Sequence, residues 1–411
     1  MTVNKELPIH RIPTKTFKTI RIQLRFFEPL DEATVSARAL MLSMLQAKTG
    51  DYPSRRIFQN HLESLYDTQL FTKATKLGNT HVGEIGVRFI HPDYAGEDDY
   101  LEDVLKALKS ALLNPDFDDA LLREEKRFLK AHFASEYANK DVYATKRYQE
   151  HLFRDHPYRV SANGTPEGVD PVALENVHEA YKRLLENPVF ITVVGDVDPS
   201  LADTIKAAFS FARPGLPESM LVRHGMRSKE SVHETLNLSQ DRLFMTLKSD
   251  VYYPDNDVYA MRVLDTLLGG GSDSLLFDTI RETHGLAYQV HSNYQPFTGL
   301  ITIMAGVAHS NVEKAKDLVR DTLSTLQQGA FTDDALSIAK QSLKQAIKRS
   351  FDLQGALATK ALLHEAFGTP MGKDEVLSML DAVRKDDVVR VANTLEFIFT
   401  YVLGGKRDAE T

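Results

Sequence analysis

The feature that most constrains the fold of this chain is an internal repeat of its layout. The segment LMLSMLQAKTGDYPSRRIFQNHLESLY, which begins at Leu40, is laid out like VLDTLLGGGSDSLLFDTIRETHGLAY, which begins at Val263. The apolar strand FITVVGD at Phe190 is matched in the same way by FTYVLGG at Phe399. A layout that recurs after about 200 residues indicates two related domains rather than one large core.

Each repeat is expected to form an α+β domain, in which an antiparallel-rich sheet is covered by helices. The length of 411 residues allows two or three domains. Pro214, Gly215 and Pro217 interrupt the pattern between the repeats. The predicted organisation is an N-terminal domain over 1–211, a linker over 212–230 and a C-terminal domain over 231–411.

Local patterns place strands and helices along both repeats. Apolar residues alternate with Arg21, Gln23 and Arg25 over residues 20–26, which predicts a half-buried strand. Further strands are expected at 69–75, 81–90, 189–194 and 243–247, in a hairpin over 288–307, and at 397–403. A first helix is expected to begin after Asp31 or Thr34 and to run until Gly50. Further helices are expected from 54 to 65 and at about 100–113, 118–137, 172–185, 257–268, 311–328 and 332–351, with a loop over 152–171.

In the second repeat, three consecutive glycines, Gly269 to Gly271, connect one helix to the next. Glycine permits a left-handed backbone and lets another backbone come close. Arg281 follows near the end of the next helix, Gly285 stops that helix, and Tyr288 opens a strand. A guanidinium and a phenol can both hold a carbonyl or a carboxylate. From local pattern alone, an Arg beside the helix macrodipole and an ordinary strand Tyr are the commoner case.

The stretch GGGSDSLLFDTIRETHGLAY resembles the C-terminal-domain signature of the pitrilysin-like M16 metallopeptidases, which include mitochondrial processing peptidase. HPYRVSANGTPEGV and NPVFITVVGDVD are further family-like passages, so the resemblance covers nearly the whole chain. It implies a duplicated LuxS/MPP-like metallohydrolase fold. It also implies that Arg281 and Tyr288, with Gly270 and Gly271, hold the backbone of the substrate near the zinc of another domain.

The chain departs from this family at the zinc site. Active members carry His-x-x-Glu-His on their first long helix, where two His bind zinc and the Glu is the general base. In this chain Ala39, Leu42 and Ser43 stand at the positions of His, Glu and His, and the later Glu ligand falls near His132. We therefore expect no metal and no cofactor in this chain, and zinc only in a partner subunit.

Composition narrows the possible partners. The net charge is −8 and no Lys/Arg-rich run stands out, so nucleic acid is not an expected partner. The absence of cysteine excludes disulfides, thiolate metal sites and cysteine nucleophiles. No apolar run approaches ~20 residues and the first residues lack an apolar signal segment, so we expect no membrane span and a cytoplasmic protein.

Three functions from different classes remain. The first is the non-catalytic subunit of a bacterial M16 peptidase pair, which supplies Arg281 and Tyr288 to a peptide at a zinc-bearing partner. This arrangement is similar to that of the YfmF-like proteins, a group associated with 5-aminopentanol modification of elongation factor P. The second is a purely structural or binding homologue, like the core subunits of respiratory complexes. The third is an independent zinc-dependent processing peptidase.

The Arg281 and Tyr288 stretch favours the first function, because a scaffold does not need it. The residues at the zinc positions count against the third. We expect the chain to be inactive alone and to take part in peptide cleavage only with a catalytic partner. A heterodimer is the expected assembly, with a homodimer as the alternative.

Overall fold

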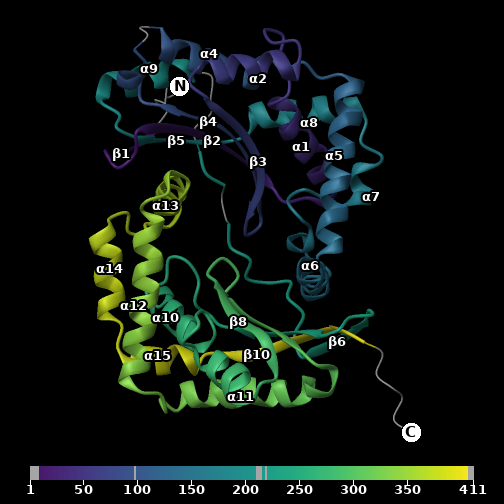
Figure 1. The fold of residues 1–411 in the computed structure, drawn as a ribbon, viewed down its shortest axis with the longest axis vertical. Coiled ribbons are helices and arrows are strands. Elements are labelled where there is room, and N and C mark those ends of the chain that lie inside the picture. Colours follow the sequence, from purple (N-terminus) through teal and green to yellow (C-terminus); the bar gives the residue numbers. More distant parts are fainter. Residues whose placement is uncertain (1–8, 97–98, 210–214, 218–219, 406–411) are drawn as a thin grey trace, which may run out of the picture. The chain divides into compact units, whose positions relative to one another are not determined.

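The computed structural model describes residues 9–96, 99–209, 215–217 and 220–405 (Figure 1). These residues belong to two compact units. Unit 1 lies within Met1–Ala138, Val160–Met220 and Phe351–Gly368, and unit 2 lies within Asn139–Arg159, Leu221–Ser350 and Thr369–Thr411. The predicted chain boundaries at 211 and 230 stay a prediction, and part of the predicted linker lies outside the described residues.

Unit 1 contains a five-stranded sheet with the order β1-β5-β2-β4-β3, in which only β1 and β5 pair in parallel. Helices α1 and α4 pack on one face of this sheet, and α5 and α8 pack on α1. The strands are β1 (Ile9–Pro13), β2 (Thr19–Pro29), β3 (Gln69–Leu77), β4 (Thr80–Ile90) and β5 (Val189–Gly195). The helices are α1 (Glu32–Leu45), α2 (Arg55–Ser64), α3 (Pro92–Ala95), α4 (Tyr100–Leu113), α5 (Asp119–Ala138), α7 (Pro166–Val169), α8 (Leu174–Glu186), α9 (Pro199–Ala208) and α13 (Gln354–Phe367).

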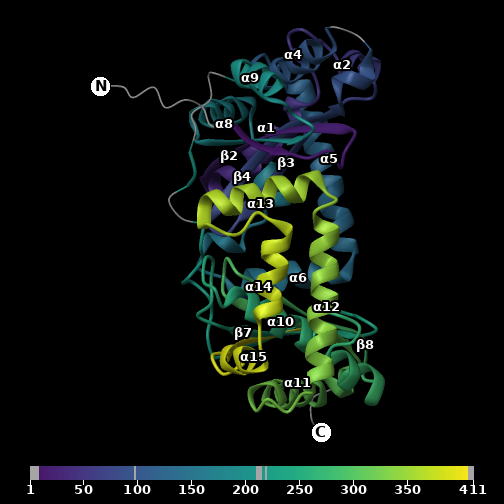
Figure 2. The ribbon, with the colours of Figure 1, turned by 90° about the vertical axis from the view of Figure 1, so that its left-hand side faces the viewer.

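Unit 2 repeats this topology, with the order β6-β10-β7-β9-β8 and one parallel pair between β6 and β10. Helix α10 packs against β8, and α12 and α14 run side by side (Figure 2). The strands are β6 (Glu230–Thr235), β7 (Asp241–Lys248), β8 (Ala287–Gln295), β9 (Leu300–Val307) and β10 (Glu396–Gly404). The helices are α6 (Lys140–Leu152), α10 (Val258–Leu268), α11 (Val312–Gln327), α12 (Asp333–Ser350), α14 (Lys373–Ala382) and α15 (Lys385–Ala392), with short helices η1 (Pro157–Arg159), η2 (Phe277–Thr283) and η3 (His309–Asn311). The expected α+β fold with two related sheets is confirmed.

Each sheet is covered on its second face by a helix from the other half of the chain. In unit 2, the ring of Tyr148 on α6 stacks on Phe244 at 4.7 Å between ring centres. In unit 1, the guanidinium of Arg25 on β2 donates to the Ala358 carbonyl of α13 at 2.8 Å. The Gln354 amide at the start of α13 donates to the carbonyls of two strands of the same sheet. Helices α6 and α13 are thus exchanged between the two halves of the sequence.

The expectation that β2 is half-buried is wrong. Gln23 and Arg25, predicted to face water, are 1% and 4% exposed. Their side chains share the carboxylate of Glu84 on the neighbouring strand, with Gln23 Nε2 at 2.6 Å and Arg25 Nε at 3.2 Å. The physical reason is that α13 covers the face on which these polar residues lie.

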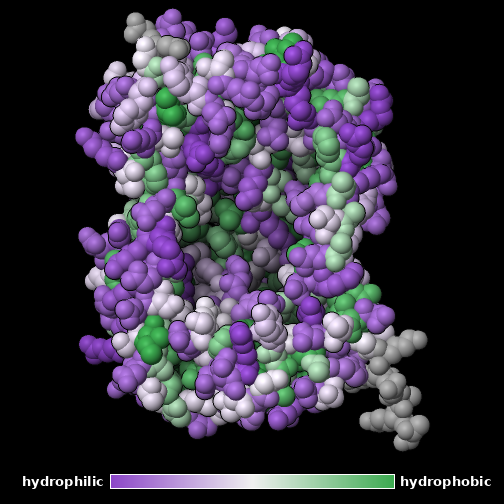
Figure 3. All heavy atoms as spheres, in the orientation of Figure 1, coloured by the Kyte–Doolittle hydropathy of each residue, from purple (hydrophilic) through white to green (hydrophobic). Residues whose placement is uncertain are grey.

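The surface is mostly hydrophilic. On the face shown in Figure 3, hydrophobic side chains occur in small groups among hydrophilic ones. Tyr288 is the most exposed large hydrophobic residue in the described part of the chain, at 71%. Among the described residues, no helix is both long and apolar enough to cross a membrane.

Candidate functional site

The glycine run after α10 lies against strand β8. The Ser292 N–H donates to the Gly269 carbonyl at 3.0 Å, and a Cβ atom on Gly269 would lie 2.7 Å from the Ser292 nitrogen. A Cβ on Gly270 would lie 2.9 Å from the Cα of Thr266, whereas on Gly271 it would meet no atom nearer than 3.9 Å. None of the three glycines has a left-handed φ. Close backbone approach therefore explains the first two glycines.

Asp265 on α10 also closes part of the edge of β8. Its carboxylate accepts hydrogen bonds from the Ser292 hydroxyl at 2.6 Å and from the Tyr294 N–H at 3.0 Å. Strand β8 is the outermost strand of its sheet. The Asp265 carboxylate and the Gly269 carbonyl accept from the N–H groups of Tyr294 and Ser292, which an edge strand otherwise leaves open for pairing. Burial raises the pKa of Asp265 to about 6, although both hydrogen bonds act to lower it.

Arg281 lies in η2, which is a π-helical turn rather than the α-helix that the sequence predicts. As expected, the turn ends at Gly285, which has φ +60°. The N–H groups of Gly285 and Leu286 donate to the carbonyls of Arg281 and Ile280. Single π-helical turns are rare and occur frequently at functional sites.

Tyr288 lies at a second irregularity, a β-bulge at the start of β8. Ala287 pairs with Val307 and Gln289 pairs with Gly306, so the register shifts across Tyr288. Bulges occur next to active sites, where they re-aim a side chain. The bulge presents the Tyr288 ring at the surface.

The two irregular segments bring the predicted Arg and Tyr together. The Arg281 Cζ lies 5.2 Å from the centre of the Tyr288 ring and 4.6 Å from that of Phe277. Its ion-pair partner is the adjacent Glu282, at 3.5 Å from Nε. The sequence prediction missed Phe277, although its position four residues before Arg281 on a helical turn places the two side chains next to each other. That these residues bind substrate stays a prediction.

The positions that the resemblance aligns with the zinc ligands lie on α1, and their side chains do not fit zinc. Leu42 is 1% exposed, and its methyl groups pack against β4 at Gly83. Ala39 is buried, and the Ser43 hydroxyl donates to the Leu40 carbonyl at 2.8 Å. Zinc in proteins takes nitrogen, sulfur or carboxylate ligands, and these side chains offer no such atom.

A buried ion pair lies next to these positions instead. Arg38 on α1 is fully buried. Its Nη1 lies 2.5 Å from a Glu28 carboxylate oxygen of β2, and its Nη2 donates to the Phe26 carbonyl at 2.9 Å. Burial acts to raise the pKa of Glu28, but the charge and hydrogen bond of Arg38 outweigh it and lower the pKa. The pair connects α1 to the sheet.

Other polar groups have structural roles. His132, near the position of the later zinc ligand, is half exposed on α5 and lies 3.4 Å from Glu136. Within the described ranges, no group of three or more His, Cys, Asp or Glu residues could hold a metal ion.

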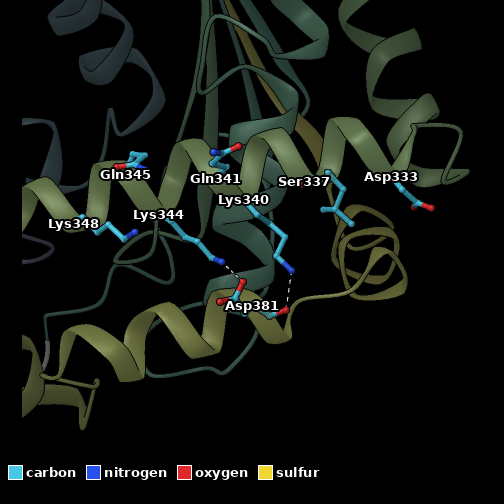
Figure 4. A pocket seen from close by; sticks show the side chains of 9 residues that line it. Asp333, Ser337, Lys340, Gln341, Lys344, Gln345, Lys348 and Asp381 are labelled. Atoms are coloured by element: carbon cyan, nitrogen blue, oxygen red, sulfur yellow. Dashed lines mark hydrogen bonds and ion pairs between the residues drawn. The ribbon is translucent and has the colours of Figure 1, made fainter.

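A groove of about 530 Å³ runs along α12 (Figure 4). Two of its lysines bind the end of α14, because Lys340 donates to the Asp381 carbonyl at 2.8 Å and Lys344 pairs with the Asp381 carboxylate.

Comparisons with known proteins agree with this geometry. A family model described as Peptidase M16 inactive domain matches residues 171–343. The probable inactive metalloprotease YmfF of Bacillus subtilis (strain 168) is 25% identical over 413 residues, which are 98% of this chain and 97% of that protein. The structure of a conserved protein from Enterococcus faecalis V583 has a TM-score of 0.89 at 24% identity, over 98% of this chain and 97% of that one. The structure of a peptidase M16 inactive domain from Pseudomonas fluorescens has a TM-score of 0.80 at 19% identity, over 98% and 96%.

The match to YmfF runs from end to end of both chains. The two solved structures share the duplicated fold. The chain therefore resembles the inactive homologues of the M16 peptidase family, and its duplicated fold is theirs.

Proposed function

We propose that this chain is the non-catalytic subunit of an M16-type zinc peptidase pair and presents Arg281 and Tyr288 to the backbone of a peptide substrate. One observation carries the proposal: the Arg281 guanidinium lies 4.6 Å from the ring centre of Phe277 and 5.2 Å from that of the exposed Tyr288. Its only ion-pair partner in the described part of the chain is the adjacent and exposed Glu282. Arg281 therefore keeps N–H donors available for a ligand.

The chemistry of this pair suits a peptide carbonyl. A guanidinium is a planar fork of N–H donors that is always charged, and a phenol adds one O–H donor. Contact with two rings restricts the Arg281 side chain, so less of its conformational freedom is lost on binding. The pair would orient the substrate and stabilise the negative charge that grows on the attacked carbonyl oxygen.

The zinc and the general base would come from the partner subunit, since Ala39, Leu42 and Ser43 supply neither. The functional unit would be a heterodimer of this chain with an M16 subunit that carries His-x-x-Glu-His. The chain alone would need no cofactor. Such a pair would act, for example, in the 5-aminopentanol modification of elongation factor P.

The test is peptidase kinetics on the complex of this chain with a zinc-bearing M16 subunit from the same genome. Arg281→Ala and Tyr288→Phe should each lower kcat/KM by roughly 10²–10³, the usual cost of removing one preorganised donor. Arg281→Lys should restore only part of the loss, because an ammonium does not reproduce the guanidinium fork. Melting temperatures and subunit affinity should stay close to those of the unchanged chain.

Arg320→Ala is the matched control. Arg320 is an exposed Arg of the same unit, paired with Asp317 at 3.0 Å. Its loss should leave the kinetics unchanged. If Arg281→Ala behaves like Arg320→Ala, and Tyr288→Phe is also silent, the pair is structural and the chain is a purely structural or binding homologue.

A further inference from the structure

A cavity of about 220 Å³ lies in unit 2, between α6 and the face of the sheet that α6 covers. Its floor is formed by apolar side chains of two neighbouring strands, Phe244 on β7 and Leu300 and Met304 on β9. Residues of α6 and of the segment that follows it form one wall, including Leu152 and Phe153. The cavity does not involve the Arg281 and Tyr288 side chains.

The aromatic walls of the cavity are held in place. The Tyr148 ring stacks on Phe244 with an angle of 10° between the planes, and its hydroxyl lies 2.7 Å from the hydroxyl of Thr246. The Phe153 ring meets Tyr158 edge to face at 4.7 Å. Because these contacts fix the rings and use the Tyr148 hydroxyl, the aromatic part of the walls offers a rigid, apolar surface.

The rim of the cavity is polar and uncharged. His291, Asn293 and Gln295 alternate along β8, so their side chains lie on one face of the sheet, and all three are exposed. Among the described residues, the structure gives the side-chain amides of Asn293 and Gln295 no hydrogen-bond partner. Burial lowers the pKa of His291, against the opposing charge of Asp141, so its imidazole is neutral at pH 7. Of the residues that the structure describes, no Asp, Glu, Lys or Arg lines the cavity.

The volume and position of the cavity limit what it can bind. A cofactor or drug-sized molecule needs about 300–1,000 Å³, which is more than this cavity holds. An apolar cavity of about 150 Å³ is enough for a benzene ring. Strand β8 leads from the cavity rim to Tyr288, which is three residues before His291 and thus roughly 10 Å away along the strand.

We propose that this cavity binds one large apolar side chain, aromatic or aliphatic, of an extended peptide whose backbone bonds to the free amides of Asn293 and Gln295. The inference rests on the proposed function for the link to Arg281 and Tyr288, because the same peptide would reach both. Unlike the Arg and Tyr, which contact backbone, the cavity would select among sequences.

The test uses the full chain alone and fluorescein-labelled, blocked octapeptides of Ser and Thr with one central Phe, Leu, Ala or Lys. Fluorescence anisotropy gives each Kd. Burial of a large apolar side chain should make the Phe and Leu peptides bind roughly tenfold to a hundredfold more tightly than the Ala peptide. The Lys peptide should gain nothing over Ala, since the cavity has no carboxylate to pair with an ammonium.

Asn293→Phe should fill the cavity mouth and abolish the preference for Phe and Leu, and Gln295→Phe provides a second filling variant at the same rim. Thr235→Phe is the matched control, because it adds the same ring at an exposed strand position outside the cavity. Melting temperatures of all variants establish that they are folded.

Loss of the preference in both filling variants, with retention in Thr235→Phe, supports the inference. Equal affinity of the unchanged chain for all four peptides, or no binding at all, overturns it. A preference that survives both filling variants also overturns it. These outcomes are independent of the Arg281 kinetics: a Phe preference that the filling variants remove supports the cavity even if Arg281→Ala leaves cleavage unchanged.

Discussion

Asp265 shows how one side chain can close part of a sheet edge. Its carboxylate accepts hydrogen bonds from the Ser292 hydroxyl and the Tyr294 N–H of β8. The carbonyl of the adjacent Gly269 accepts one from the N–H of Ser292. Open edge strands pair readily with other chains. The edge of β8 is therefore protected along its second half, whereas the exposed Tyr288 lies at its start.

Asp265 should make the free energy of unfolding depend on pH. Its pKa is about 6 in the folded chain and about 3.9 in an unfolded one, so the folded state holds the proton more tightly. Its contribution to stability is fully present below about pH 4 and is lost as pH rises to about 6, by up to about 3 kcal/mol. Asp265→Asn should remove this component, which urea unfolding at pH 4.5 and pH 7 measures.

Asp273→Asn is the control for this prediction, because Asp273 is an exposed carboxylate in the same connection. It should leave the pH profile of the wild-type chain unchanged. Asparagine at this position would have one acceptor oxygen fewer than Asp265, so the substitution lowers the free energy of unfolding at every pH. The quantity to compare is therefore the change in the free energy of unfolding between the two pH values. An unchanged slope in Asp265→Asn would contradict the assignment.

At the scale of elements, the sequence predicted most strands and helices of the two repeats. The alternating run at β2 and the helical spacing at α1 correctly predict a strand and a helix, but both elements are more deeply buried than those patterns indicate. The polar face of β2 was assigned to water because nothing near it in sequence indicates a cover. Its cover, α13, lies 333 residues from Arg25, and no local pattern contains that information.

The candidate site was predictable only in part. The family-like stretch singled out Arg281 and Tyr288, and the helix-to-strand turn between them is present. The π-helical turn and the bulge depend on how η2 and β8 pack, so periodicity could not predict them. The cavity over β7 and β9 also escaped prediction, because its wall is the exchanged helix α6.

The connection from α10 to β8 gives a test of the glycine turn as an element. Gly269→Ala would place a Cβ 2.7 Å from a backbone nitrogen of β8, so the strand must shift, at a cost of roughly 1–3 kcal/mol. Gly271→Ala has open space and no left-handed φ, so it should be neutral or stabilise by up to about 1 kcal/mol. Urea unfolding of the two variants measures the difference. Equal effects would show that contact with Ser292 does not explain the first glycine.

At the scale of the whole molecule, the proposal requires a second chain. Co-expression with a zinc-bearing M16 subunit should give a stable heterodimer, whose interface buries more than the ~1,600 Å² of a standard complex. Metal analysis after dialysis should find one zinc per heterodimer and none held by this chain alone, because α1 carries Ala39 and Leu42 at the ligand and base positions. Sedimentation showing two separate species at micromolar concentration would count against the pair.

The exchange of α6 and α13 has a consequence for the order in which the protein can form during synthesis. The carbonyl that Arg25 binds belongs to Ala358, 333 residues later. At 5–20 residues per second, a ribosome needs roughly 20 to 70 s to make that stretch. During this interval the β2 face that carries Arg25 lacks α13, even after β5, the last strand of its sheet, has been made. The nascent chain is therefore most open to chaperones and to proteolysis just before its last sixty or so residues emerge, and a release of the first half alone would leave that face exposed for good.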